Sequence, residues 1–245
     1  MAALSPNREK RRVEIAVLIY SPLWMAAIAL VQHGHWFLRW GDGVHLAFGL
    51  ALAAPLWLLA FASPHGARFI ALITLLSFLQ NYFGASLFFD AFGMEYHFPV
   101  RWILQRTPVF LYLVTVSYFA TYYVALTIAW RALRTRFPNA PRAATVIARA
   151  ILSYAVAFAE TFAMANDSLR DYFSYRNPHA VMWFGSICYG TVFFLTLPLF
   201  YDLDEDPALA PVPLRRSIWD LLALNMLILI CYQLYGVIYP LVARS

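Results

Sequence analysis

Long apolar stretches recur along the chain, and only short polar segments separate them. Seven stretches reach the roughly 20 residues that a helix needs to cross the hydrocarbon core of a bilayer. Their apolar residues are continuous rather than alternating, which favours helices over the strands of a transmembrane barrel. The pattern predicts an all-α, polytopic transmembrane bundle of about seven helices. The predicted helices cover residues 13–32, 44–63, 69–90, 108–130, 144–165, 180–200 and 217–241.

Little chain remains outside these stretches, so we expect a single transmembrane domain over residues 1–245. The composition agrees, because 62% of the residues are hydrophobic and 13% are charged, whereas soluble domains are about one quarter charged. The first stretch is too long for the apolar region of a cleaved signal peptide, so we interpret it as a retained span. We therefore expect an integral, multi-pass membrane protein.

Basic residues are distributed unequally between alternate connections. The N-terminus and the segments after the second, fourth and sixth stretches, with the adjoining helix ends, carry most of the 18 Lys and Arg residues. By the positive-inside rule, the N-terminus is expected in the cytoplasm and the C-terminus outside. The net charge of +5 then reflects topology and contact with anionic membrane lipids, and it requires no nucleic-acid partner.

Glu160 is the clearest ionisable residue inside a predicted span. Such a group costs about 2.5–3.5 kcal/mol to insert even on lenient scales, so it marks a functional position by default. Helical spacing places Ser153, Ala157 and Met164 on the same face as Glu160, and the small residues leave room for a ligand or a close helix. A structural hydrogen bond between helices is the alternative interpretation of Glu160.

Three further polar side chains, those of Gln80, Asn81 and Tyr82, interrupt the third stretch. Adjacent residues of a helix point in different directions, so we expect that not all three face one cavity. Asn81 is as compatible with bonding between helices as with a site. An outer-side polar cluster is also expected where the third and fifth helices end. Its members would be Glu160, Asn166, Asp90, Glu95 and His97.

The remaining titratable residues are expected to have structural roles, and their spacing argues against metal, nucleotide and retinal sites. Glu14 and Asp220 lie at predicted cytoplasmic helix ends, where Glu14 suits the helix dipole. The two cysteines, Cys188 and Cys231, are expected to be small buried side chains. The sequence contains no metal-ligand spacing and no glycine-rich phosphate loop. We expect no metal and no cofactor. A retinal protein needs a lysine in a helix, and the only lysine is Lys10 near the N-terminus.

Five segments, in order along nearly the whole chain, carry a family resemblance. They are VEIAVLIYSPLW at 13–24, NYFGASLFFDAFGMEYHFP at 81–99, SYAVAFAETFAMAN at 153–166, CYGTVFFLTLPLFYDLDE at 188–205 and, as a looser match, WDLLALNML at 219–227. Together they resemble the cycloeucalenol cycloisomerases, which open the 9β,19-cyclopropane ring of a sterol. The chain departs from the family at Ser86 and Tyr123, where family members often carry histidine. Its Ala- and Arg-rich composition suggests a bacterial member, located in the inner membrane, or in the endoplasmic reticulum if the source is eukaryotic.

The resemblance implies an intramolecular isomerase without a cofactor, acting on a sterol or triterpenoid lipid. A protonated carboxyl in apolar surroundings would donate a proton to the cyclopropane, and an 8(9) double bond would form after proton loss. The implied catalytic set is Glu160, Asn81, Tyr82, Thr161 and Asn166. The implied substrate-binding set is Tyr20, Trp24, Phe88, Tyr96 and Tyr154. The base is unassigned, with His97, Asp220 and Glu14 as weaker acid–base candidates.

Two other classes of function stay open on the sequence alone. A transporter or a lipid-binding membrane protein without catalysis is one, although no internal repeat is evident and the polar residues within the spans are few for an ion path. An isomerase acting on another sterol is the other, because it also needs a buried acid and an apolar pocket. The oligomeric state is not determined by these patterns.

Overall fold

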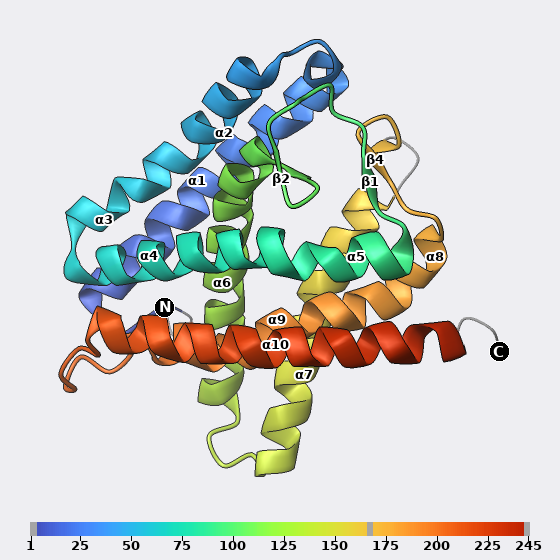
Figure 1. Ribbon diagram of the computed structural model, residues 1–245. Coiled ribbons are helices and arrows are strands. Elements are labelled where there is room, and N and C mark those ends of the chain that lie inside the picture. The colour runs from blue at the N-terminus through green and yellow to red at the C-terminus, as the bar shows by residue number, and fades with distance from the viewer. Residues whose placement is uncertain (1–3, 166–168, 243–245) are drawn as a thin grey trace.

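Helices make up most of the computed structural model, which describes residues 4–165 and 169–242 (Figure 1). Within these residues, seven helical segments are long and apolar enough to cross a membrane, which confirms the predicted polytopic bundle. Four are single helices: α1 (Arg8–His33), α6 (Val109–Arg136), α7 (Arg142–Met164) and α10 (Leu214–Val242). The other three spans are each built from two or three shorter helices.

The composite spans are irregular at defined positions. The second joins α2 (Asp42–Trp57) to α3 (Leu59–Ala62) after the short helix η1 (Trp36–Leu38). In the third, the π-helix η2 (Gln80–Gly84) lies between α4 (Pro64–Leu79) and α5 (Ala85–Phe92). In the sixth, the π-helix η4 (Val181–Gly185) lies between α8 (Pro178–Ala180) and α9 (Ser186–Asp202). A π-turn inside an α-helix commonly accompanies a functional site.

Four two-residue strands connect the helices at one end of the molecule. β1 (Glu95–Tyr96) pairs antiparallel with β4 (Phe173–Ser174), so the connection after the third span contacts the one after the fifth. β2 (Ile103–Leu104) and β3 (Thr107–Pro108) pair with each other. Tyr96 of β1 and Phe173 of β4 also line a cavity between the helices.

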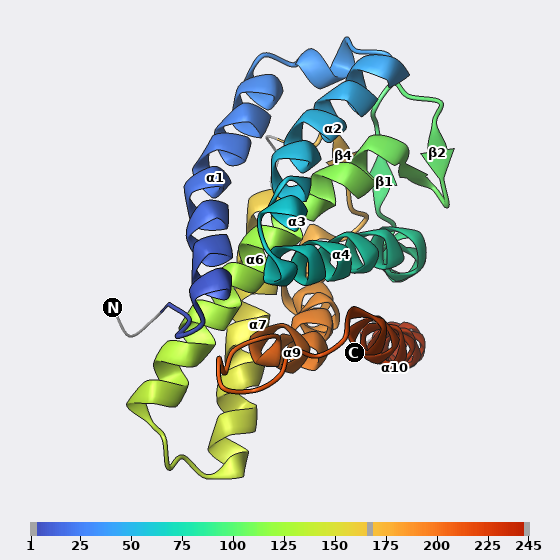
Figure 2. The same cartoon turned by 90° about the vertical axis from the view of Figure 1, so that its left-hand side faces the viewer.

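The helices cross at steep angles and do not form a simple up-and-down bundle. α6 runs through the middle of the molecule and crosses α4 and α10 (Figure 1), and Figure 2 shows α10 nearly end-on, below α4. α6 is the most deeply buried span and packs against α1, α2, α4 and α9. Fully buried side chains of these helices, among them Leu72, Ile73, Phe119 and Phe193, form the main core. α7, by contrast, has the smallest buried share of the seven spans.

Helix α1 begins five residues before the first predicted apolar stretch because a polar side chain caps it. The Asn7 side-chain oxygen accepts a hydrogen bond from the backbone N–H of Glu9 at 2.9 Å. This cap satisfies a donor that the first helical turn leaves without an intrahelical partner. The added turn holds Lys10, whose ammonium group reaches the backbone carbonyls of Phe200 and Leu203 at the end of α9.

A buried ionic cluster at this end joins three distant segments. The Arg131 guanidinium, near the end of α6, donates to Glu14 at 2.7 Å and to Glu205 at 2.9 Å. The Lys10 ammonium lies 2.9 Å from Glu205. Glu14 was expected to favour the helix dipole, but it is an almost fully buried ion-pair partner of Arg131. The N-terminus, the end of α6 and the connection before α10 are thus tied together.

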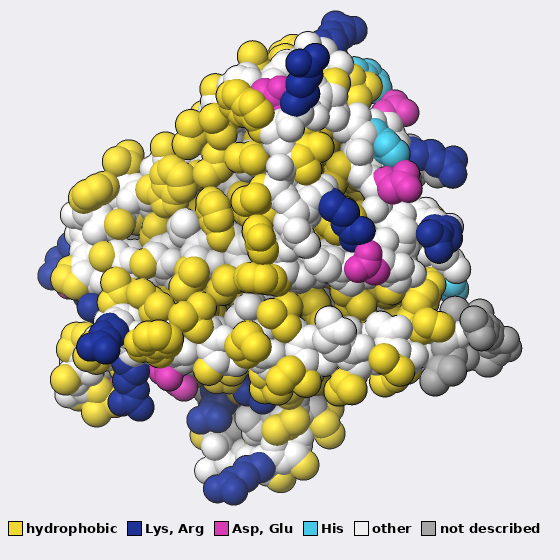
Figure 3. All heavy atoms as spheres, in the orientation of Figure 1, with side chains coloured by type: hydrophobic (Ala, Val, Ile, Leu, Met, Phe, Trp, Pro, Cys, Tyr) yellow, Lys and Arg dark blue, Asp and Glu magenta, His cyan; other side chains and the backbone are white. Residues whose placement is uncertain are grey.

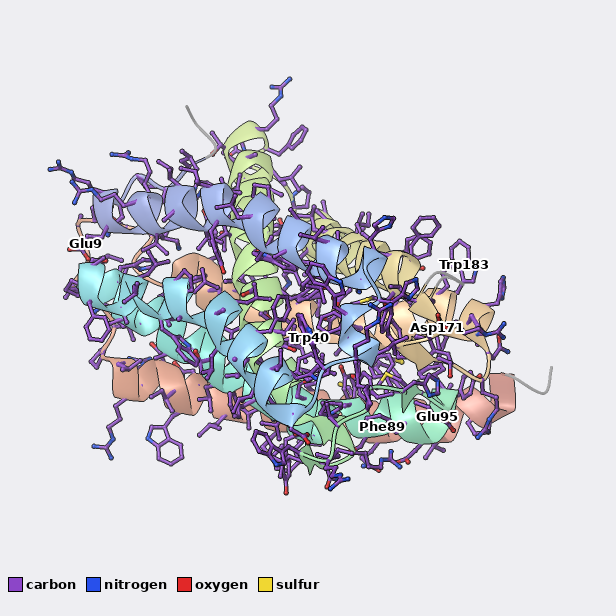
Figure 4. All side chains as sticks on the ribbon, turned by 90° about the horizontal axis from the view of Figure 1, so that it is seen from above. Glu9, Trp40, Phe89, Glu95, Asp171 and Trp183 are labelled. Carbon is purple, nitrogen blue, oxygen red and sulfur yellow. The ribbon has the colours of Figure 1, made fainter. Side chains whose placement is uncertain are left out.

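The N-terminus and the connections after the second and sixth spans, which the positive-inside rule assigned to the same side of the membrane, lie together in the structure. Near the ionic cluster, Asp204 accepts hydrogen bonds from His65 at 2.7 Å and from Arg68 at 2.8 Å, which joins the start of α4 to the connection before α10. Glu9 lies at this end, whereas Glu95 and Asp171 lie at the opposite side (Figure 4). Figure 3 shows hydrophobic side chains over the face between, with Lys and Arg mainly toward its edges. The cytoplasmic location of the Glu9 end stays a prediction.

The Asp204 contacts predict an acid-dependent contribution to stability. Burial alone would raise the pKa of Asp204, but the hydrogen bonds from His65 and Arg68 outweigh it and lower the pKa below its usual value of 3.8. A lowered folded-state pKa adds stability above the unfolded pKa, and that stability is lost as pH falls through the folded pKa. We therefore expect Asp204→Asn to lower the melting temperature of the detergent-solubilised protein near neutral pH, and the difference to shrink below about pH 4.

Asparagine is the suitable replacement because Asp204 has a positive φ of 52°, and asparagine tolerates that region. The variant therefore removes the charge without adding backbone strain. A melting-temperature difference that stays constant from neutral pH to below pH 4 would contradict an ionic contribution from Asp204.

Candidate active site

A cavity of about 210 Å³ lies between α1, η2, α6, α7, α9 and α10, and β1 and β4 contribute to its wall. Its lining is mainly apolar and aromatic, as is typical of sites that bind small apolar ligands. Among the described residues, Glu160 is the only Asp, Glu, His, Lys or Arg that lines it. The remaining polar lining side chains are amides, threonine hydroxyls and tyrosine hydroxyls.

Glu160 is held at the cavity by the buried face of α7. Ser153, Ala157 and Thr161 on this face are almost completely buried, and Ser153 lies beside Gly190 of α9, where a Cβ would be 3.4 Å from the Ser153 carbonyl oxygen. The close approach of the two helices directs Glu160 toward the cavity rather than into lipid. Its Oε2 atom is buried and has no hydrogen-bond partner among the described residues.

Five tyrosines surround this carboxyl group. The hydroxyls of Tyr122 on α6 and Tyr189 on α9 lie nearest to it, and those of Tyr96, Tyr118 and Tyr175 interact with it electrostatically. Burial raises the pKa of both Tyr96 and Tyr175, so these two phenols are neutral donors at physiological pH. A single carboxyl group thus shares an apolar cavity with several neutral phenols and their electron-rich rings.

The π-turn η2 forms another part of the cavity wall. Gln80, Asn81 and Gly84 all line the cavity, although neighbouring residues of a regular α-helix would point further apart. Asn81 Nδ2 donates to the Ser77 carbonyl at 2.8 Å and to Thr115 at 2.9 Å. Gln80 Nε2 donates to Asn225 of α10 at 2.7 Å. The amides therefore hydrogen-bond neighbouring helices and also line the cavity, which are the two roles that the sequence left open for Asn81.

The other predicted catalytic residues have different positions. Thr161 lines the cavity, but its hydroxyl donates to the Ala157 carbonyl at 2.9 Å rather than to Glu160. Tyr82 is 37% exposed and does not line the cavity. Asn166 lies outside the residues that the structure describes. The structure therefore brings Glu160, Asn81 and Thr161 together and leaves Tyr82 on the outer surface of η2.

The predicted substrate-binding residues also separate into two groups. Phe88 and Tyr96 line the cavity. Tyr20 and Trp24 lie behind its wall, where the Tyr20 hydroxyl donates to the Leu52 carbonyl at 2.9 Å and the Trp24 ring packs 4.4 Å from the Tyr118 ring. Tyr154 is partly buried on α7 and does not line the cavity. Only Phe88 and Tyr96 are therefore placed to touch a ligand directly.

Apart from Glu160, the described members of the expected outer-side polar cluster do not line the cavity. Asp90 pairs with Arg106 at 2.8 Å on the surface, and His97 contacts Ser174 at 2.9 Å, also in an exposed position. Asp220 is exposed beside Arg216 at the other end of the molecule. Among the carboxyl groups expected near the outer ends of the third and fifth helices and described by the structure, Glu160 alone lines the cavity.

Sequence reasoning missed Tyr118, Tyr122, Tyr175 and Tyr189. The available signal was the four-residue spacing of Tyr118 and Tyr122, which places both on one face of α6. That spacing does not tell whether the face meets lipid, core or cavity, and 15 tyrosines occur in the chain. No group of three or more His, Cys, Asp or Glu side chains that could hold a metal ion occurs in the described part of the chain.

The comparisons with known proteins give one informative match. No family model and no solved structure matches the chain. Cycloeucalenol cycloisomerase from Arabidopsis thaliana is 28% identical over 262 residues, which cover 97% of this chain and 91% of that protein. The relative is named as an isomerase, which supports the prediction that this chain is an enzyme of that class. The similarity over nearly the full length of both chains confirms the resemblance to the cycloeucalenol cycloisomerase family.

Proposed function

We propose that this chain is a sterol isomerase that opens a 9β,19-cyclopropane ring and leaves an 8(9) double bond. The observation that carries the proposal is the single carboxyl group, Glu160, in an apolar cavity surrounded by tyrosines. The name of the plant relative supports the same reaction class. The substrate class is a cyclopropyl sterol or triterpenoid that reaches the cavity from the surrounding membrane lipid.

Ring opening needs a strong, dry proton donor because a cyclopropane is a very weak base. Apolar surroundings favour the neutral form of a carboxyl group, which is the form that donates. In the proposed step the Glu160 proton adds to C19, the electron pair of the C9–C19 bond forms the new C–H bond, and C9 becomes cationic. The angular methyl group is then complete, and Glu160 is left as a carboxylate.

Loss of the proton on C8 completes the isomerisation. The C8–H electron pair forms the double bond to C9, and the proton goes to a base. Because no other Asp, Glu, His or Lys among the described residues lines the cavity, we assign the base role to the Glu160 carboxylate as well. One residue then donates and recovers the proton, so substrate and product have the same composition and the enzyme returns to its starting state.

The aromatic wall suits the cation that forms between the two proton transfers. Tyr118, Tyr189 and Phe88 line the cavity, and a ring face within about 6 Å attracts a positive charge. The hydroxyls of Tyr122 and Tyr189 donate toward the carboxylate that remains after protonation. Both halves of the transient ion pair are therefore stabilised without water. Lipid binding without catalysis would require the apolar cavity but would not require a buried carboxyl group.

The proposal is tested by incubating membranes that contain the protein with cycloeucalenol and with cycloartenol. We expect an isomeric product with an 8(9) double bond and a new angular methyl group, detected by mass spectrometry and proton NMR. In D₂O the new methyl group gains at most one deuterium from the exchangeable acid. Membranes without the protein serve as the control. Recovery of both sterols unchanged would exclude cyclopropane opening and leave the lipid-binding alternative.

A further inference from the structure

The two amides of η2 each carry an oxygen that accepts no hydrogen bond from a described residue. Both Asn81 Nδ2 hydrogens are used by the Ser77 carbonyl and by Thr115. A backbone carbonyl accepts only, so this contact fixes which amide atom is nitrogen and turns Oδ1 away from it. Neither Asn81 Oδ1 nor Gln80 Oε1 accepts a hydrogen bond from a described residue, and neither belongs to the fully buried polar atoms that lack a partner. Both oxygens therefore keep an unused acceptor on residues that line the cavity.

The neighbouring residues hold the Gln80 side chain in place. Its nitrogen is tied to Asn225 of α10 at 2.7 Å. Gly84, one π-turn later, makes room for the oxygen, because a Cβ at residue 84 would lie 2.4 Å from Gln80 Oε1. A pre-positioned acceptor loses little entropy when a donor arrives, so its hydrogen bond contributes more of its energy to binding.

The amides and the carboxyl group are linked through two rings. The Cβ position at Gly84 lies 3.4 Å from Tyr232 of α10, Tyr232 interacts with Tyr189, and Tyr189 interacts with Glu160. A ligand that touches η2 with one end can therefore meet Glu160 along the wall of the same cavity. In a cyclopropyl sterol the hydroxyl on C3 and the cyclopropane at C9 and C10 are likewise only a few bonds apart.

We propose that Gln80 and Asn81 form the subsite that binds the 3β-hydroxyl of the sterol and so set the position of the cyclopropane relative to Glu160. This subsite rests on the proposed function for the identity of the ligand. The hydroxyl donates its hydrogen to one of the amide oxygens. Among the described residues, the other lining side chains with a carbonyl oxygen are those of Gln32 and Glu160, and the proposed function keeps Glu160 for the cyclopropane. The subsite selects a free hydroxyl over an ether or an ester at the same carbon.

The test measures binding rather than turnover, with cycloeucalenol and its 3β-methyl ether as the two probes. The ether cannot donate a hydrogen bond, so we expect the purified protein in lipid nanodiscs to bind it roughly tenfold more weakly than cycloeucalenol. At least one of the variants Gln80→Met and Asn81→Leu should bring this ratio toward one. Phe83→Leu is the matched control on the same turn, because Phe83 is exposed and does not line the cavity. It should keep the ratio of the unmodified protein.

The outcomes separate the subsite from the reaction. Equal binding of the two probes by the unmodified protein, or binding of neither, overturns the subsite even if the variants fail to fold. A preference that survives both amide variants overturns the assignment to Gln80 and Asn81. Absence of ring opening together with a preference that both variants abolish refutes the proposed reaction and supports the subsite.

Discussion

Glu160→Gln is expected to lower ring opening by about 10³-fold, within the 10²–10⁴-fold range of general acid–base catalysis, while sterol binding stays within about threefold. The amide has nearly the same size and shape as the carboxyl group but cannot supply the proton. Because Glu160 is assigned both proton transfers, no second residue is available to replace it. The measurement is single-turnover conversion of cycloeucalenol by the purified protein, with the dissociation constant determined in parallel.

Two further variants separate acid chemistry from packing at this position. Ser153→Ala changes a buried hydroxyl on the same face of α7 that has no hydrogen-bond partner among the described residues and does not line the cavity, so turnover should be unchanged. Glu160→Asp keeps the acid on a shorter stem and should retain part of the activity. Turnover of Glu160→Gln close to that of the unmodified protein would remove Glu160 from the mechanism. Equal losses in Glu160→Gln and Glu160→Asp would indicate a structural role.

The spans and the carboxyl group were accessible from sequence for the same physical reason. A bilayer tolerates long apolar stretches and penalises a charge among them, so seven stretches predicted seven spans, and Glu160 was conspicuous within one of them. The structure confirms the seven spans and places Glu160 at the cavity. Local composition was sufficient here because each inference concerned one segment at a time.

The surroundings of Glu160 were not accessible in the same way. Tyr118, Tyr175 and Tyr189 come from α6, from the segment after β4 and from α9, and only the steep crossing of the helices brings them together. Gln80 and Asn81 share a wall because η2 is a π-turn, a distortion without a reliable signature in one sequence. The same limitation explains Glu14, whose helix-start position was clear but whose partner Arg131 is 117 residues away.

That distant pair leads to the largest effect expected on stability. Arg131→Met should lower the free energy of unfolding by about 3–5 kcal/mol, the usual loss when one partner of a buried ion pair is removed. Arg131 is 4% exposed and bonds both Glu14 and Glu205. Its loss leaves Glu205 paired with Lys10 and leaves Glu14 with the Ser5 backbone N–H but without its ion-pair partner. The measurement is reversible unfolding in detergent micelles, followed by circular dichroism.

The matched control is Arg136→Met, in the last turn of the same helix, because Arg136 is exposed and surface charges contribute little. Adding Glu14→Gln to Arg131→Met should recover part of the loss, since it removes one uncompensated charge. Tyr122 lies nine residues before Arg131 on α6, about 13 Å along the helix, so turnover per folded molecule should not change. Equal effects of Arg131→Met and Arg136→Met would show that the cluster contributes nothing specific. A loss of turnover per folded molecule would instead couple this end of α6 to the cavity.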